Sequence, residues 1–255
     1  MKRLKRLFAE WIAGRRVKQN FRCDPDDIFL VSYPKSGNTW IRFVLANLFY
    51  ENDNVNFTNI HKLLPEINRI SDHAGFEGVP RIIKSHDIYN PDYPRVIYIV
   101  RDGRDVYVSY YRYLQENLPP GMTFKAFLLQ ADMPFGRWSG HIVSWCTPQP
   151  RIHMVRYEDM HAKPVETIVK LLEFINFKAN KSQIETALKK ASFEKMKQIE
   201  QVFGRGKYKS GPEVFMRGGR IGDWKDHYGE AEKAVFKNTE NKALVMLEYE
   251  QDDTW

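Results

Sequence analysis

The stretch SYPKSGNTWIRF, residues 32–43, connects an apolar run to a helical pattern through a short polar loop. Pro34 has no N–H for a strand ladder, so it ends the strand, and Gly37 allows the backbone to turn sharply. Small polar residues typical of a helix N-cap occupy the junction: Ser36, Asn38 and Thr39. The free N–H groups at the start of the helix, together with the charge of Lys35, predict a cradle for a phosphate-like anion. An ordinary capped turn between a strand and a helix is the alternative interpretation.

The rest of the chain repeats this alternation of strand and helix. Short stretches rich in Val, Ile and Tyr are predicted as buried strands: residues 28–33, 81–85, 95–100 and 151–157. Helical periods occupy other segments: residues 39–50, 104–116, 124–130, 165–175, 181–190 and 230–247. This order predicts an α/β fold in a single domain, with a central, mostly parallel sheet flanked by helices. Segments without a clear period remain: residues 53–77, 119–139 and 204–220.

Length, charge and cysteines narrow the class of protein. The 255 residues suit one large domain, and no repeat or low-complexity linker divides them. Lys and Arg outnumber Asp and Glu by 39 to 32, which indicates either a surface that favours solubility or an anionic partner. Cys23 and Cys146 lie far apart and in no metal-ligand spacing. We therefore expect neither a disulfide framework nor a zinc site, and a cytoplasmic location.

Residues 1–20 are predicted as a basic amphipathic helix that precedes a domain over residues 21–255. Apolar residues recur there with the period of one helix face: Leu4, Leu7, Phe8, Trp11 and Ile12. Lysines and arginines surround this face. The favoured interpretation is that the apolar face packs on the chain's own domain, and peripheral contact of residues 1–16 with an anionic membrane is the alternative.

Two further basic segments extend the predicted anion site, because ligands in parallel sheets bind beyond the carboxyl ends of the strands. In RVIYIVRDGRDVYVSYYRYL, residues 95–114, Arg101 follows a strand, Ser109 lies on the next helix and Arg104 stands between them. An arginine fork with a serine hydroxyl suits a second phosphate. The glycine-rich segment FMRGGRIGDWK, residues 215–225, carries two more arginines: Arg217 and Arg220. Together these segments predict a site for a nucleotide with separated phosphates, although the kinase motif G-x-x-x-x-G-K-[ST] is absent from the sequence.

In combination, these segments resemble the soluble sulfotransferases that use 3′-phosphoadenosine 5′-phosphosulfate (PAPS). The matching segments occur in family order: YPKSGNTW at 33–40, residues 101–109, RYEDM at 156–160, ASFEKM at 191–196 and RGGRIGDWK at 217–225. The resemblance spans roughly residues 28–228 and implies a P-loop-like nucleotide-binding architecture. Two departures affect donor binding, because Gly218 replaces a family lysine and Ala191 replaces a family threonine.

The resemblance implies a role for each matching residue. Lys35 is expected to hold the bridging and sulfuryl oxygens of PAPS, with Ser36 modulating that contact. The inner phosphate is expected to lie against three residues: Gly37, Asn38 and Thr39. The adenine is expected to lie between Trp40 and Phe193, with Tyr157 at the edge of the base. The 3′-phosphate is expected to contact the remaining group: Arg101, Ser109, Arg217, Gly218 and Gly219.

The segment RIIKSHD, residues 81–87, supplies a lysine and a histidine directly after a strand. Strand alternation places Lys84 and His86 on one face, so both side chains can point into the same cleft. His86 matches the general base of the family, a role that suits a side chain titrating near neutral pH. Without the resemblance, a surface histidine at a strand end is the alternative. Lys35, Lys84 and the helix amides supply positive charge, so we expect no metal.

The sequence therefore predicts a sulfotransferase that moves the sulfuryl group of PAPS to a hydroxyl or amine of a small-molecule acceptor by in-line displacement. Residues 204–213 are the predicted lid. We expect no nucleic acid partner, and the sequence leaves the oligomeric state open. The alternatives are a glycolipid or carbohydrate sulfotransferase at a membrane surface, a P-loop-type nucleotide or small-molecule kinase, and a nucleotide-binding module without catalysis.

Overall fold

The computed structural model of the chain describes residues 23–51, 54–67, 78–130, 135–146, 149–204 and 218–255. The predicted N-terminal helix, and with it the proposed division at residue 20, lies outside the described residues. So do Arg217 and nearly all of the predicted lid.

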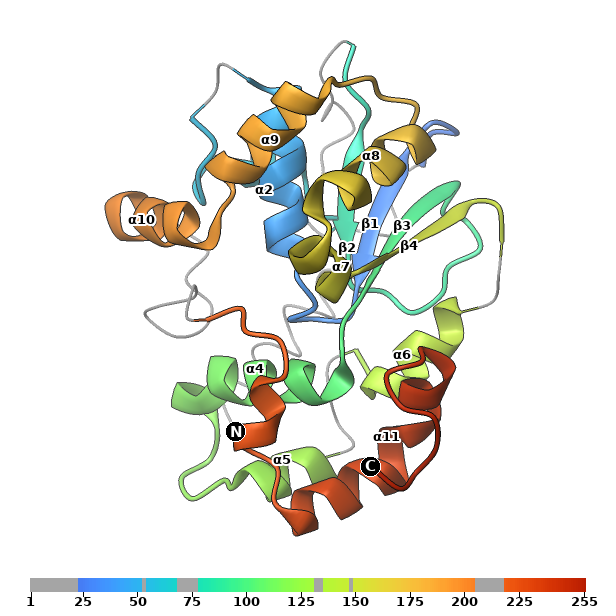
Figure 1. Cartoon of the computed structure of the whole chain (residues 1–255), viewed down its shortest axis with the longest axis vertical. Helices are drawn as coiled ribbons and strands as arrows, with labels where there is room; N and C mark the ends of the chain where they lie inside the picture. Colours follow the sequence, from blue (N-terminus) through green and yellow to red (C-terminus); the bar gives the residue numbers. More distant parts are fainter. Residues whose placement is uncertain (1–22, 52–53, 68–77, 131–134, 147–148, 205–217) are drawn as a thin grey trace.

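A parallel sheet forms the centre of the molecule (Figure 1). Its strands are β1 (Ile28–Ser32), β2 (Ile82–Ser85), β3 (Arg95–Val100) and β4 (Ile152–Arg156), in the order β2-β1-β3-β4. Leu30 of β1 pairs with Lys84 on one side and with Ile97 on the other, so the register places the carboxyl ends of β1, β2 and β3 together. All four predicted strands are confirmed, and their observed bounds lie within one residue of the predicted ones.

Helices cover both faces of the sheet. The α-helices are α2 (Asn38–Phe49), α3 (Ile60–Leu63), α4 (Gly103–Leu114), α5 (Phe124–Leu129), α6 (Trp138–Trp145), α7 (Tyr157–Ala162), α8 (Pro164–Phe174), α9 (Lys181–Lys190), α10 (Phe193–Phe203) and α11 (Glu230–Met246). Two short 3-10 helices are η1 (Gln115–Asn117) and η3 (Asp223–Asp226). The six predicted helices are confirmed as α2, α4, α5, α8, α9 and α11.

Two apolar cores lie on opposite faces of the sheet, because successive strand residues point to opposite sides. Phe29 and Val31 of β1 belong to the core with α4, α5, α6 and α11. Ile28 and Leu30 belong to the other core, with α2, α8 and α9. β1 is completely buried, as expected for a central strand of a parallel sheet. The predicted α/β class with a central parallel sheet is confirmed.

Four helices were not predicted from the sequence. α6 falls partly within residues 119–139, which were expected to be irregular, and its N-cap residue Arg137 makes no side-chain cap. Its two buried tryptophans, Trp138 and Trp145, contribute to the core around α4 and α11. Tyr157 was assigned to the last strand, but it begins α7, which follows β4 without a loop. Short helices such as these depend on tertiary contacts more than on their own propensity.

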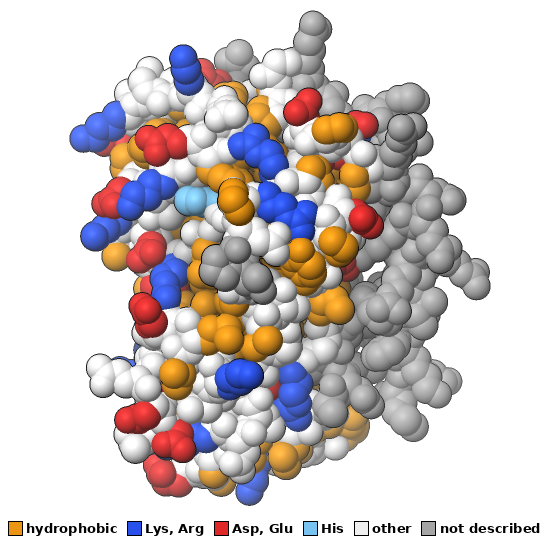
Figure 2. All heavy atoms as spheres, turned by 90° about the vertical axis from the view of Figure 1, so that its right-hand side faces the viewer, with side chains coloured by type: hydrophobic (Ala, Val, Ile, Leu, Met, Phe, Trp, Pro, Cys, Tyr) orange, Lys and Arg blue, Asp and Glu red, His pale blue; other side chains and the backbone are white. Residues whose placement is uncertain are grey.

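The positive charge surplus does not form one continuous surface on the face shown in Figure 2. The described residues of that face carry Lys and Arg side chains interspersed with acidic and hydrophobic ones. β4 is an edge strand of the sheet, and its Met154 is partly exposed. In the part of the chain that the structure describes, no helix is long and apolar enough to cross a membrane.

We predict that Gly103→Ala lowers the free energy of unfolding by about 1–3 kcal/mol through overpacking. A Cβ at Gly103 would lie 2.5 Å from Cε3 of the fully buried Trp138. Gly140→Ala is the matched control, because no described atom lies within 4 Å of its added Cβ, and alanine favours the helix. Urea unfolding followed by circular dichroism measures both, and equal midpoints would contradict the prediction.

Candidate active site

The loop after β1 reverses the chain through residues with unusual backbone angles. Gly37 has φ of 97°, and a Cβ there would lie 2.5 Å from Cδ2 of Tyr157, so glycine is required both for the turn and for the close approach. Lys35 also has a positive φ, of 72°, which is uncommon for a residue with a side chain. This turn presents the first N–H groups of α2 at the carboxyl end of the sheet.

Asn38 has a structural role in this loop. Its Nδ2 donates to the backbone oxygen of Leu30 at 3.1 Å and to Oγ of Ser32 at 3.2 Å. The side-chain amide therefore ties α2 to β1. Its backbone N–H belongs to the first turn of the helix, where N–H groups have no partner within the helix.

Several buried polar atoms of the predicted site have no hydrogen-bond partner among the described residues: Oγ of Ser36, Nε1 of Trp40 and Nε of Arg101. Ser36 is only 1% exposed. A buried donor without a partner costs roughly 1–3 kcal/mol, so these positions favour a ligand rich in acceptor atoms. The residues present thus fit a nucleotide with phosphate groups.

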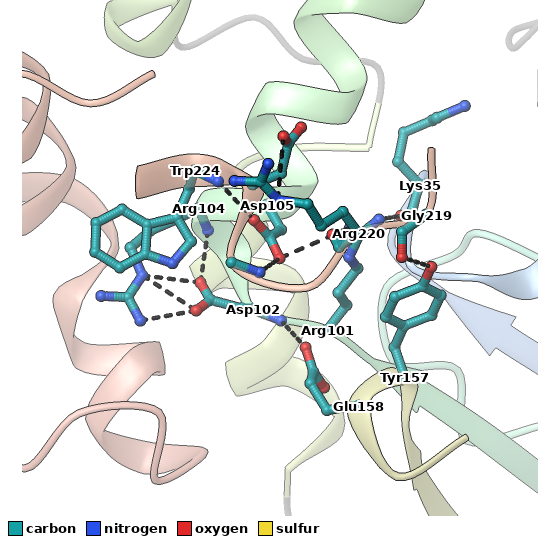
Figure 3. Close-up of polar contacts among 12 residues, drawn as sticks. Lys35, Arg101, Asp102, Arg104, Asp105, Tyr157, Glu158, Gly219, Arg220 and Trp224 are labelled. Atoms are coloured by element: carbon teal, nitrogen blue, oxygen red, sulfur yellow. Dashed lines mark hydrogen bonds and ion pairs between the residues drawn. The ribbon is translucent and has the colours of Figure 1, made fainter. Parts of the chain in front are cut away.

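Arg101 connects the basic segments that the sequence analysis singled out (Figure 3). Its guanidinium donates to the backbone oxygens of Lys35, at 3.2 Å, and Arg220, at 3.0 Å. It also lies 4.3 Å from the centre of the Tyr157 ring. One buried cation therefore holds the loop after β1, the start of α4, the start of α7 and the glycine-rich loop in one place.

The glycine-rich loop is also held from α4 and α7. The Asp105 carboxylate accepts from the backbone N–H groups of Gly222, at 2.8 Å, and Trp224, at 2.9 Å. Burial raises the pKa of this carboxyl group, and nearby Arg101 opposes the shift. Tyr157 donates its hydroxyl to the backbone oxygen of Gly219 at 2.7 Å (Figure 3). Gly219 is thus held by the same tyrosine whose ring lies against Arg101.

Arg104, which lies between Arg101 and Ser109 in the chain, is held by other protein groups. Its guanidinium is buried and pairs with Asp102 and Glu250. It lies 4.0 Å from the ring centre of Trp224 and 4.5 Å from that of Trp255. Arg104 therefore anchors the C-terminal segment instead of facing a ligand.

The remaining predicted donor-binding residues lie on α2, α4 and α10. Ser109 is half-buried on α4, and Thr39 is half-buried in the first turn of α2. The Trp40 ring lies edge-on to Tyr157, with centroids 5.8 Å apart. Phe193 begins α10, and its Cδ2 lies 3.8 Å from the position of a Cβ on Gly219. The side chain of Arg220 pairs with Asp226, so in this structure it does not replace the lysine missing at Gly218.

His86 follows β2 and meets the end of β1. Its Nδ1 lies 2.6 Å from the backbone oxygen of Ser32. A carbonyl oxygen can only accept, so Nδ1 carries the proton and Nε2 presents a bare lone pair. Burial, together with the charge of Lys84, lowers the pKa of His86 to about 3. The imidazole is therefore neutral near pH 7, which is the form that a general base requires. Its pKa lies below the near-neutral value expected from the sequence, because the side chain is buried beside Lys84.

A polar network supports the segment that carries His86. The Asp87 carboxylate accepts from the hydroxyls of Ser85, at 2.8 Å, and Tyr93, at 2.5 Å. Trp145 of α6 donates Nε1–H to the backbone oxygen of Asp87 at 2.9 Å. Three hydrogen bonds to Asp87 therefore fix the backbone next to His86.

Both predicted catalytic lysines contact side chains that the sequence analysis missed. Lys35 Nζ lies 4.3 Å from the ring centre of Tyr113 on α4. Lys84 Nζ lies 3.2 Å from Oε1 of Glu66, which belongs to a segment expected to be irregular. A lone acidic residue within the apolar run LLPEI was the only available signal for Glu66.

Comparisons with known proteins agree with this geometry. The family model described as "Sulfotransferase domain" matches residues 25–245. Sulfotransferase 1E1 of Bos taurus is 30% identical over 256 residues, covering 87% of this chain and 84% of that protein. Sulfotransferase 1E1 of Mus musculus is 31% identical over 248 residues, covering 85% and 82%.

Solved structures resemble this one over most of its length. Mouse sulfotransferase SULT7A1, complexed with PAP, has a TM-score of 0.69 and 25% identity, covering 92% of this chain and 93% of that chain. Retinol dehydratase, in complex with androsterone and inactive cofactor PAP, has a TM-score of 0.71 over 91% of this chain and 85% of that chain. At 18% identity the second likeness concerns the fold alone.

The fold and the anion-binding loops thus define a nucleotide-dependent transferase of the P-loop-like α/β class. This chain belongs to the sulfotransferase family. The sequence-based prediction of a PAPS-dependent sulfotransferase is confirmed.

We predict that His86 remains neutral in the free enzyme from about pH 8 down to about pH 5. Its pKa is lowered to about 3, so protonation requires a lower pH than the usual value of about 6.5. Proton–carbon correlation spectra of the histidine rings measure this, and the spectrum of His86→Gln assigns the resonance. A midpoint near pH 6.5 for that resonance would contradict the prediction.

Proposed function

We propose that the protein transfers the sulfuryl group of PAPS to a hydroxyl or amine of a small-molecule acceptor, with His86 as the general base. One observation carries this proposal. The Nδ1–H of His86 is held by the backbone oxygen of Ser32, three residues before Lys35. The bare Nε2 of the base and the anion-binding loop are therefore supported by the end of the same strand.

The loops around Arg101 are proposed to bind the donor. The N-terminal N–H groups of α2, with Ser36 and Thr39, would hold the inner phosphate, and Trp40 and Phe193 would flank the adenine. The 3′-phosphate would lie near Arg101, Ser109, Gly218 and Gly219, with Arg217 a further proposed contact outside the described residues. The orphaned donors of Ser36, Trp40 and Arg101 support this assignment.

PAPS supplies an activated sulfuryl group, and the chain supplies the proton transfer and the charge. His86 accepts the acceptor's proton as the acceptor oxygen or nitrogen forms its bond to sulfur. The bond between sulfur and the phosphate oxygen breaks, and the electron pair leaves with that phosphate. Lys35 and Lys84 would neutralise the developing negative charge. Their present contacts, with Tyr113 and Glu66, keep both ammonium groups near the site.

The alternative functions differ in how much support they have. Membership of the sulfotransferase family does not favour the kinase or the idle binding module. A glycolipid acceptor at a membrane surface depends on residues 1–16, which lie outside the described residues, so it stays a prediction. We propose a cytoplasmic location, which agrees with the free thiols of Cys23 and Cys146.

We predict that His86→Gln lowers the rate of sulfuryl transfer roughly 10²–10⁴-fold, the usual contribution of general base catalysis. The binding constant for PAP should stay unchanged. Labelled PAPS with a panel of phenols, alcohols and amines measures transfer, and calorimetry measures PAP binding. His153→Gln on β4 is the control and should retain activity. Transfer at the wild-type rate by His86→Gln would exclude His86 as the base, and transfer from ATP would favour the kinase.

We predict that Tyr157→Phe weakens PAP binding roughly 2–10-fold, because the glycine-rich loop loses one hydrogen bond worth about 0.5–1.5 kcal/mol. Tyr111→Phe is the matched control. Its hydroxyl donates to the backbone oxygen of Met122 at 2.7 Å, away from the loops around Arg101. Calorimetric titration with PAP compares the two variants, and an equal loss of affinity in both would contradict a specific role for Tyr157.

A further inference from the structure

We propose that Glu66 is a positioning residue of the transfer reaction, which holds the ammonium group of Lys84 beside His86 and offsets its charge there. The inference rests on the proposed function, because it assigns a role within the same site. No resemblance pointed to Glu66.

The backbone register fixes Glu66 opposite Lys84. The segment around Glu66 adds an isolated parallel bridge to the free edge of β2. Lys84 N–H donates to the oxygen of Pro65 at 2.8 Å, and Ile67 N–H donates to the oxygen of Lys84 at 2.9 Å. Paired residues of neighbouring strands direct their side chains to the same face. The contact between Lys84 Nζ and Glu66 Oε1, at 3.2 Å, is therefore fixed by the pairing of the two backbone segments.

Glu66 has two further polar partners, the cation Arg42 and the imidazole of His61, so it does not depend on Lys84 alone. Its Oε1 lies 3.4 Å from NH1 of Arg42 and 3.0 Å from Nδ1 of His61. Arg42 is itself anchored, because its NH2 donates to the backbone oxygens of Leu64, at 2.5 Å, and Ile60, at 3.3 Å. The carboxylate stays in place when the flexible lysine side chain turns toward a new anion.

The neighbours of Glu66 keep its carboxyl group ionised. Its side chain is 18% exposed, and that of Lys84 is 17% exposed. Burial alone would raise the pKa of the Glu66 carboxyl group, but the Lys84 charge, the hydrogen bond from His61 and the Arg42 charge hold it well below its usual value. Glu66 is therefore ionised near pH 7, where His86 is neutral.

The two charges act on the base in opposite directions. The Lys84 ammonium lowers the pKa of His86, whereas the Glu66 carboxylate raises it. Without the carboxylate, the base would face an uncompensated cation and would accept a proton less readily. The ion pair thus limits the effect of the Lys84 charge on the pKa of His86. Lys84 can still bind the leaving phosphate as negative charge develops there.

The first test is Glu66→Gln, which keeps the shape of the side chain and removes its charge. We expect kcat with labelled PAPS to fall roughly tenfold, while the dissociation constant of PAP changes less than about threefold. Glu230→Gln is the control, because Glu230 lies on the exposed start of α11 and pairs only locally with Lys233. It should match the wild type in both measurements. Glu66→Asp, which keeps the charge, should recover part of the lost kcat.

A double-variant cycle with Lys84→Met separates positioning from general stability. If Glu66 acts through Lys84, then Glu66→Gln should lower kcat less than about twofold in the Lys84→Met background. If the fold-loss of kcat in the double variant equals the product of the two single fold-losses, the residues act independently and the inference is wrong. The inference is also wrong if Glu66→Gln has the same kcat as Glu230→Gln. Should Glu66→Gln fail to fold, the same cycle with Glu66→Asp decides the question by the same criteria. No transfer by the wild-type enzyme from PAPS would instead refute the proposed function.

Discussion

The site depends on one buried guanidinium at the carboxyl end of β3. Arg101 donates to backbone oxygens from two loops that are far apart in the chain, stacks on Tyr157 and lies 3.7 Å from the Asp105 carboxylate. A buried charge is costly unless it is paired, so these partners must remain in place for the fold to keep Arg101. The same requirement keeps the loop after β1 and the glycine-rich loop facing each other.

Charge compensation is the common feature of the groups around the site. Asp105 holds the glycine-rich loop, Asp102 and Glu250 hold Arg104, and Glu66 holds Lys84. Each acidic group is occupied by protein donors. Within the described part of the chain, the buried donors without a protein partner include Ser36 Oγ, Trp40 Nε1 and Arg101 Nε. The site is therefore prepared for an anionic, acceptor-rich ligand and places a neutral histidine next to it.

The predictions from sequence succeeded where the signal was local or periodic. The strands were found because buried parallel strands are continuous apolar runs, and α2 was found because its polar junction marks a helix start. α6 was missed because eight residues without a side-chain cap carry little periodic signal. The partners of Arg104 were not found from the sequence, because Glu250 is distant in the chain.

The sequence by itself determined the class of fold, the sulfotransferase family, and the residues that gather beyond the strand ends, because motif spacing and strand period are local properties of a chain. Only the tertiary structure decided which nitrogen of His86 is bare, which acid compensates Lys84, and that Arg104 faces the C-terminal segment. Those outcomes depend on contacts such as Ser32 with His86 and Glu66 with Lys84. Such contacts arise from strand register and burial, which bring together residues that no short stretch of sequence contains.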